Sequence, residues 1–148
     1  MEYDYKEVMK LSNQLCFPLY AAARNVTNLY TPHLKPLGLT YTQYIVLLVL
    51  WENEEATVGE LCEKLMLDNG TLTPLLKKLQ SAGYVERRRG EHDDRVVVIS
   101  LTDAGRELQE RAKEVPINVA GCIKLPPEKV KTLYALLYEL INDQKEDK

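Results

Sequence analysis

Hydrophobic residues in the first third of the chain recur every three or four positions, which is the spacing of amphipathic helices. Over residues 6–30 this spacing predicts one long helix, bent where Pro18 removes a backbone donor. Two prolines and a glycine between residues 31 and 39 predict a loop. The T-x-x-Q capping box that begins at Thr40 then predicts a helix that runs to about Glu52.

The pattern in the middle of the chain predicts two short helices. Residues 57–66 and 69–82 both have helical periodicity, and Gly83 is placed to end the second helix. Leucines in the second helix fall at i, i+3, i+4 and i+7, which predicts one apolar stripe facing the body. These are Leu72, Leu75, Leu76 and Leu79.

A β-hairpin is predicted to follow these helices. Residues 84–87 and 96–99 are rich in strand formers, whereas residues 88–94 between them are polar and predict a solvated turn. Two helices followed by a hairpin are typical of a winged helix-turn-helix, which binds DNA through its second helix and its hairpin. We therefore predict a DNA-binding region over residues 57–101.

Amphipathic helices are predicted on both sides of this region. A helix that begins at residues 102–105 continues past Ala112 and is disturbed at Pro116. After a break at residues 121–127, a last helix runs to about Asn142 with a strong apolar stripe. Because such faces need a partner, a second copy of the chain is the simplest explanation. The fold class is thus mainly α with a small hairpin wing, and the terminal helices form a homodimer.

The outward side of the helix at 69–82 and the arginines near the hairpin tip are candidate DNA contacts. Small polar and basic side chains suit base edges and phosphates, and an arginine at a wing tip suits a minor groove. The candidates are Asn69, Gly70, Thr71, Thr73, Pro74, Lys77, Lys78, Arg87, Arg88, Arg89 and Arg95. A two-fold dimer would present two such helices about 10 base pairs apart, which predicts a near-palindromic double-stranded operator.

The uneven distribution of charge supports a localised DNA surface. The chain has a net charge of −3, which argues against indiscriminate binding to nucleic acid. Residues 71–100 nevertheless carry six Lys and Arg against four Asp and Glu, so the rest of the chain carries −5. The positive patch thus coincides with the predicted DNA-binding region.

Composition also limits the expected cellular location of the protein and the chemistry of its side chains. In 148 residues no apolar run approaches the roughly 20 residues that span a bilayer, and the first residues do not form a signal peptide. We expect a cytoplasmic protein without a membrane partner or cofactor. Three cysteines, an odd number, favour reduced thiols over a disulfide scaffold. A metal site at His92, Asp93 and Asp94 is disfavoured because the two histidines of the chain are isolated from each other and the sequence has no C-x-x-C motif.

Several sequence motifs resemble those of the MarR family of winged-helix repressors. The family pattern is Asp94-Arg95 followed by a strand and by Leu101-Thr102-Asp103-Ala104-Gly105. Closer matches point to the organic-hydroperoxide-sensing branch: Asn13-Gln14-Leu15-Cys16-Phe17, Leu19-Tyr20-Ala21-Ala22, Leu39-Thr40-Tyr41-Thr42-Gln43-Tyr44, Leu50-Trp51-Glu52, and Asp68 to Lys77. The resemblance covers about residues 6–115.

This resemblance implies a dimeric repressor that releases its operator when Cys16 is oxidised by an organic hydroperoxide. It implies that Tyr30 and Tyr41 donate hydrogen bonds to the reactive sulfur from the partner subunit. Tyr20, four residues after Cys16, is a further candidate. The sulfenic acid would then form a disulfide with Cys122 of the partner subunit or with a low-molecular-weight thiol. Residues 1–56 would combine dimerisation with redox sensing, and residues 102–148 would complete the dimer.

Other interpretations remain open at this point. A small aromatic ligand bound between the dimer helices and the DNA-binding region, rather than oxidation, could be the signal that releases DNA. A thiol peroxidase is a third possibility, although a DNA reader would then have no purpose, so we do not expect an enzyme. Cys62 is predicted to be a core residue on the inner face of its helix, and Cys122 could be a bystander.

Overall fold

The computed structural model describes residues 4–146, with side chains described as far as Asp143. Its helices are α1 (Tyr5–Val8), α2 (Cys16–Asn28), α3 (Thr31–Leu34), α4 (Tyr41–Asn53), α5 (Val58–Leu65), α6 (Asn69–Ser81), α7 (Asp103–Ala112), α8 (Val115–Ala120) and α9 (Pro127–Glu146), with 3₁₀ turns η1 (Leu11–Asn13) and η2 (Lys35–Leu37). Its strands are β1 (Glu55–Thr57), β2 (Val85–Arg89) and β3 (Val97–Leu101). The mainly helical fold with a small antiparallel sheet confirms the predicted fold class.

The helix α4 is the centre of the core. Six of its side chains are buried: Gln43, Tyr44, Val46, Leu47, Val49 and Leu50. Its predicted capping box is present, because the Thr40 hydroxyl accepts from the Gln43 backbone and the Gln43 side chain accepts from the Thr40 backbone. Gln43 is therefore buried with its side-chain oxygen satisfied, which removes the main cost of placing an amide in the core.

The winged helix-turn-helix is built around α4 as predicted. The Thr57 and Glu60 side chains form a second capping box at the start of α5, and Asp68 caps α6. Three leucines of the α6 stripe are buried (Leu72, Leu76 and Leu79), and Leu75 is half-buried. Gly83 adopts a φ of +81° directly after α6, a conformation that glycine tolerates without strain. These local signals explain why both helices begin and end near their predicted limits.

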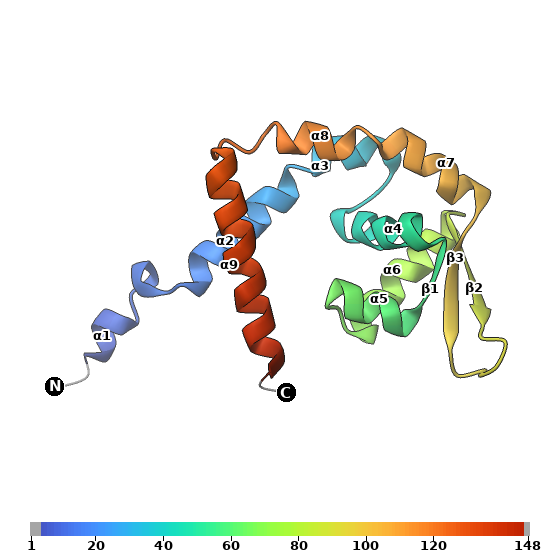
Figure 1. Cartoon of the computed structure of the whole chain (residues 1–148), viewed down its shortest axis with the longest axis horizontal. Coiled ribbons are helices and arrows are strands. Elements are labelled where there is room, and N and C mark those ends of the chain that lie inside the picture. Colours follow the sequence, from blue (N-terminus) through green and yellow to red (C-terminus); the bar gives the residue numbers. More distant parts are fainter. Residues whose placement is uncertain (1–3, 147–148) are drawn as a thin grey trace.

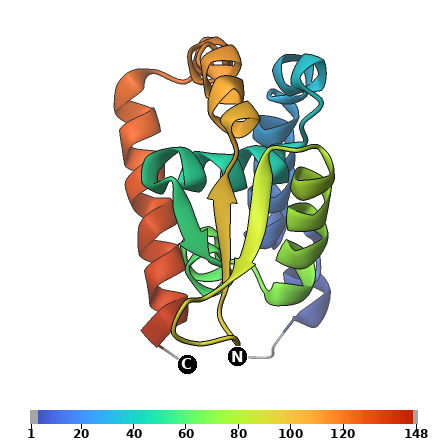
Figure 2. The same cartoon turned by 90° about the vertical axis from the view of Figure 1, so that its right-hand side faces the viewer.

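The sheet contains one strand that the sequence did not predict. The strand order is β1-β3-β2, and both pairs are antiparallel. β1 is only three residues long and pairs Ala56 with Ile99. The hairpin strands also extend further than predicted, because Arg88 and Arg89 belong to β2 rather than to the turn. Figure 2 looks onto this sheet, with β3 between its neighbours and the β2–β3 turn projecting from one end.

The prediction of one long helix over residues 6–30 is wrong. The segment is divided into α1, η1 and α2. Side chains take the place of further helical donors at the end of α1, because the side-chain amides of Asn13 and Gln14 donate to the backbone carbonyls of Glu7 and Val8. Pro18 does not bend a helix interior but lies in the first turn of α2, where its missing donor has no helical acceptor.

The predicted loop at residues 31–39 is also wrong. Residues Thr31–Leu34 form α3, and Lys35–Leu37 form η2. Pro32 and Pro36 each lie in the first turn of these elements, a position that suits proline. Leu34 and Leu39 are buried, so this segment packs onto the body. Only Gly38, with a φ of +71°, behaves as the expected turn residue.

The terminal helices extend away from the body. α7 and α8 are separated near Pro116 as predicted, whereas α9 continues to Glu146, past its predicted end. In Figure 1, α2 and α9 project to one side of the winged helix, which is joined to them through α3 and α8. None of the described side chains of α2 or α9 is buried. Exposed apolar residues of α9 include Val130, Leu133, Tyr134, Leu136, Tyr138 and Leu140.

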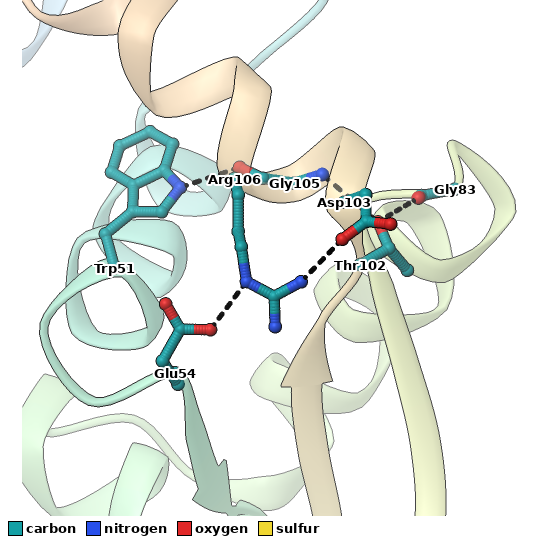
Figure 3. Close-up of polar contacts among 7 residues, drawn as sticks. All are labelled: Trp51, Glu54, Gly83, Thr102, Asp103, Gly105 and Arg106. Atoms are coloured by element: carbon teal, nitrogen blue, oxygen red, sulfur yellow. Dashed lines mark hydrogen bonds and ion pairs between the residues drawn. The ribbon is translucent and has the colours of Figure 1, made fainter.

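Gly105 is the residue through which α7 packs against α4 and the start of β2. The Gly105 backbone N–H donates to the Thr102 hydroxyl at 3.1 Å, and its carbonyl accepts from the Trp51 indole at 2.9 Å (Figure 3). The Thr102 hydroxyl also donates to the Gly83 carbonyl at 2.6 Å. A Cβ atom at Gly105 would overlap the Tyr84 carbonyl oxygen. The absence of a side chain is therefore what allows α7 to approach the start of β2.

An arginine on α7 extends the same junction at the surface. The Arg106 guanidinium donates to Glu54 at 2.7 Å and to Asp103 at 3.0 Å (Figure 3). Glu54 follows α4 with a φ of +63°, so the pair links the end of α4 to the start of α7. All three side chains are solvent-exposed, and exposed pairs of this kind contribute little to stability.

Candidate nucleic-acid interface and thiol site

The outward face of α6 carries the predicted DNA contacts. All of the predicted α6 contacts are exposed except Thr73, which is half-buried: Asn69, Gly70, Thr71, Pro74, Lys77 and Lys78. The Asp68 carboxylate accepts the Thr71 backbone N–H at 2.7 Å and the Thr71 hydroxyl at 3.1 Å. These hydrogen bonds lower the pKa of Asp68, so the cap stays ionised at neutral pH. Pro74 lies inside α6 and removes one helical donor.

The three consecutive arginines of β2 do not share one face. Arg87 is half-buried beside α6, and alternation along the strand places Arg89 on the same side. Arg88 lies on the opposite side, where its guanidinium donates to Glu55 of β1 at 2.8 Å. The Glu55 carboxylate raises the pKa of Arg88 through this hydrogen bond and its charge. A run of three basic residues in the sequence therefore contains two different environments.

A groove of about 440 Å³ lies between α5, α6 and the hairpin. Asn69 and Thr73 line it from α6, and Arg87 and Arg95 line it from the hairpin. Thr57, Val58 and Gly59 at the start of α5 line a further wall. The Arg95 backbone N–H donates to Asp93, which shapes the hairpin turn. Two guanidiniums and two neutral polar side chains make this groove suitable for an anion.

The candidate redox thiol lies at the start of a helix. Cys16 is the first residue of α2 and is exposed. The helix is 13 residues long, and helix N-termini favour nearby negative charge. Tyr20 is also exposed, and the Arg24 guanidinium lies 5.3 Å from its ring centroid. The exposed Tyr20 ring is thus engaged with a cation on its own helix.

The two candidate phenols lie at the other end of α2. The ring centroids of Tyr30 and Tyr41 are 4.8 Å apart, and those of Tyr30 and Tyr44 are 5.7 Å apart. Burial raises the pKa of Tyr41, and the neighbouring Tyr30 raises it further. The Tyr41 hydroxyl is therefore a neutral donor at physiological pH. Tyr44 was not predicted to join this cluster, although its position one turn after Tyr41 was a usable signal.

Tyr41 also borders a pocket of about 630 Å³. Thr27, Lys35 and Thr40 are among its other lining residues, which come from α2, η2 and the start of α4. The 14 residues from Cys16 to Tyr30 correspond to about 20 Å at 1.5 Å per helical residue. Cys16 therefore cannot reach this phenol cluster within one chain while α2 is intact.

The other two cysteines have different surroundings. Cys122 is exposed just after α8, and its thiol donates to the Asn118 carbonyl at 3.4 Å. Cys62 is half-buried against the core, as predicted, but its thiol also donates to Asn69 Oδ1 at 3.5 Å. Among the side chains that the structure describes, no group of three or more His, Cys, Asp or Glu could hold a metal ion. Within residues 4–146, no helix has the length and apolarity that crossing a bilayer requires.

Comparison with characterised proteins identifies the family. The chain is 48% identical over 133 residues to the organic hydroperoxide resistance transcriptional regulator of Bacillus subtilis (strain 168), a match that covers 90% of each protein. A family model of transcriptional regulators SarA/Rot matches residues 28–112. The chain belongs to the MarR family of winged-helix transcriptional regulators, in the branch of the organic hydroperoxide resistance regulator.

Solved structures place this MarR-family chain among DNA-binding proteins. It resembles reduced AbfR of Staphylococcus epidermidis bound to DNA with a TM-score of 0.77 and 38% identity, covering 94% of this chain and 97% of that one. The disulfide-formed AbfR has a TM-score of 0.64 at 40% identity, covering 92% and 96%. This MarR-family protein is a DNA-binding transcriptional regulator, and its conformation is closer to the DNA-bound AbfR structures, reduced (TM-score 0.77) or overoxidised (TM-score 0.76), than to the disulfide form.

Proposed function

We propose that the protein is a dimeric repressor that releases its operator when an organic hydroperoxide oxidises Cys16. The observation that carries the proposal is the separation of the exposed thiol from the phenol cluster by the length of α2. A second copy of the chain can supply the phenols that Cys16 cannot reach in its own chain. The exposed apolar faces of α2 and α9 support such a partner.

The chemistry requires only a thiolate and a peroxide. The Cys16 sulfur attacks one peroxide oxygen, the O–O bond breaks, and the alcohol leaves after taking up a proton. Cys16 is left as a sulfenic acid, oxidised by two electrons. The hydroxyls of Tyr30 and Tyr41 from the partner would donate hydrogen bonds to the thiolate before this step. Oxidation replaces that anion by a neutral group and so weakens the contacts between the subunits.

Release follows if the oxidised dimer holds its two α6 helices at a different spacing. Two recognition helices must enter successive major grooves together, so a change of a few ångströms in their separation is enough. The lower similarity of this chain to disulfide-formed AbfR than to the two DNA-bound AbfR structures, reduced and overoxidised, supports such a rearrangement when a disulfide forms. The competing signal, a small ligand in the pocket beside Tyr41, would release DNA without any change at Cys16.

Cys122 is the proposed resolving thiol. Its thiol would attack the sulfenic sulfur of Cys16 in the partner, forming a disulfide and releasing water. On a non-reducing gel, organic hydroperoxide is expected to convert the 17.0 kDa chain into a species of about twice that mass, and dithiothreitol should reverse this. Cys122→Ser should abolish the band, whereas Cys62→Ser, the matched control, should retain it. A monomer band that persists in the wild type would assign resolution to a low-molecular-weight thiol instead.

The two environments in β2 predict different roles in DNA binding. Arg87→Gln is expected to weaken operator binding about 5- to 100-fold, because Arg87 faces the groove beside α6. The slope of log affinity against log salt should also become shallower by about one, as expected for a side chain that neutralises one phosphate. Arg88→Gln removes the same charge from the same strand but from the side paired with Glu55. It should therefore change affinity less than about threefold. Electrophoretic mobility shifts at several salt concentrations measure the affinity and the salt slope of each variant. Equal losses of affinity in the two variants would contradict the assignment of Arg87 alone to the DNA contact.

A further inference from the structure

The Cys62 thiol connects α5 to Asn69, the first residue of α6, which is the recognition helix of the proposed DNA interface. Cys62 lies on α5, and its Sγ donates to Oδ1 of Asn69, which begins α6. The Cys62 carbonyl also accepts the Leu67 backbone N–H at 3.0 Å, within the turn between the two helices. Its half-buried side chain packs on the core. The thiol thus lies at the point where α6 begins, in contact with the first residue of that helix.

This contact selects the orientation of an amide. An asparagine side chain has an accepting oxygen at one end and a donating NH₂ group at the other, and rotation by 180° exchanges them. A thiol has one weak S–H donor and a weakly accepting sulfur, and here the Cys62 S–H donates to the Asn69 oxygen. The Asn69 NH₂ group is then available to an acceptor outside the α5–α6 pair. Without the thiol, the two orientations would differ much less in energy.

The surroundings of Asn69 indicate which acceptor fits. Asn69 lines the groove together with Thr73, Arg87 and Arg95, beside apolar residues that include Leu76 and Val97. The polar side chains among these can all donate hydrogen bonds to one anionic oxygen group. An amide oxygen turned into the same groove would repel that anion. A DNA backbone phosphate, which approaches both a recognition helix and a wing, has the matching charge and geometry.

We propose that Cys62 is a positioning residue of the DNA interface, which holds the Asn69 amide so that its NH₂ group donates to a backbone phosphate in the groove between α6 and the hairpin. This rests on the proposed contact of α6 and the hairpin with DNA. Cys62 does not touch the DNA itself. Its role is separate from the redox chemistry assigned to Cys16.

A double-mutant cycle in reducing buffer tests the proposal. Affinities for operator and for unrelated DNA are measured for the wild type, Cys62→Ala, Asn69→Ala and the double variant. Cys62→Ala is expected to weaken operator binding about three- to tenfold, the effect of one hydrogen bond, and Asn69→Ala about tenfold. In the Asn69→Ala background, Cys62→Ala should have less than about a twofold effect. Cys62→Ser, which keeps a donor, should restore affinity to within about threefold of the wild type.

The outcomes separate this role from simple packing. Equal effects of Cys62→Ala in both backgrounds, or no effect in either, would overturn the proposal, as would failure of serine to restore binding. A loss in Asn69→Ala confined to operator DNA would overturn the phosphate assignment, because a phosphate contact weakens all DNA alike. Thermal unfolding identifies any variant that fails to fold. If Arg87→Gln also leaves DNA affinity unchanged, the groove is not a DNA contact and the proposed function of this surface fails instead.

Discussion

Gly105→Ala is expected to destabilise the protein by about 3–5 kcal/mol, because the new methyl group would overlap the Tyr84 carbonyl oxygen. The backbone at Gly105 cannot move away from Tyr84 easily. The Gly105 N–H is bound to Thr102, and its carbonyl accepts from Trp51. For a chain of this size the expected loss is roughly 10 °C or more in Tm, measured by calorimetry or circular dichroism. Since α7 links the winged helix to the terminal helices, operator affinity should fall as well.

Gly59→Ala is the matched control for this substitution. Gly59 lies in the first turn of α5, and only the Thr57 hydroxyl oxygen, at 3.9 Å, comes within 4 Å of a Cβ built there. Alanine also has the higher helix propensity, so this variant should match or exceed the wild type by up to about 1 kcal/mol. Similar Tm values for the two glycine variants would show that α7 tolerates a side chain at its junction with β2.

Cys16→Ser is expected to abolish the response to organic hydroperoxide while leaving reduced operator binding intact. In the wild type, oxidation should weaken operator binding by about 5- to 150-fold, the usual range for coupling between two sites. Serine has a similar shape, but its hydroxyl is not oxidised by peroxides, so the variant should remain bound. Fluorescence anisotropy of labelled operator, followed during titration with an organic hydroperoxide, measures the release.

Reduction supplies the control for this experiment. Dithiothreitol should restore binding of the oxidised wild type, because both a protein disulfide and a mixed disulfide are reducible. Release from Cys16→Ser at the same hydroperoxide concentration would show that Cys16 is not the sensor. Release by a small aromatic compound, equal in both proteins, would favour the pocket beside Tyr41 as the site of the signal.

Much of the DNA-binding unit was predictable because its signals are local. The capping pairs Thr40–Gln43 and Thr57–Glu60 act within four residues, as does the leucine stripe of α6. The N-terminal region was less predictable. Pro18, Pro32 and Pro36 indicate a bend and a loop in the sequence, whereas each occupies a first helical turn, where proline fits.

The sequence by itself determined the limits of α4, α5 and α6, the leucine stripe of α6 and the family motifs around Cys16, since each depends on neighbours along the chain. Only the tertiary structure decided that β1 pairs with β3, that Arg88 turns toward Glu55 and that the Cys62 thiol reaches Asn69. It also decided that α7 can approach β2 only at a glycine. The physical reason is that these contacts join separate elements. Their partners are selected by packing around α4, which no local pattern of side chains specifies.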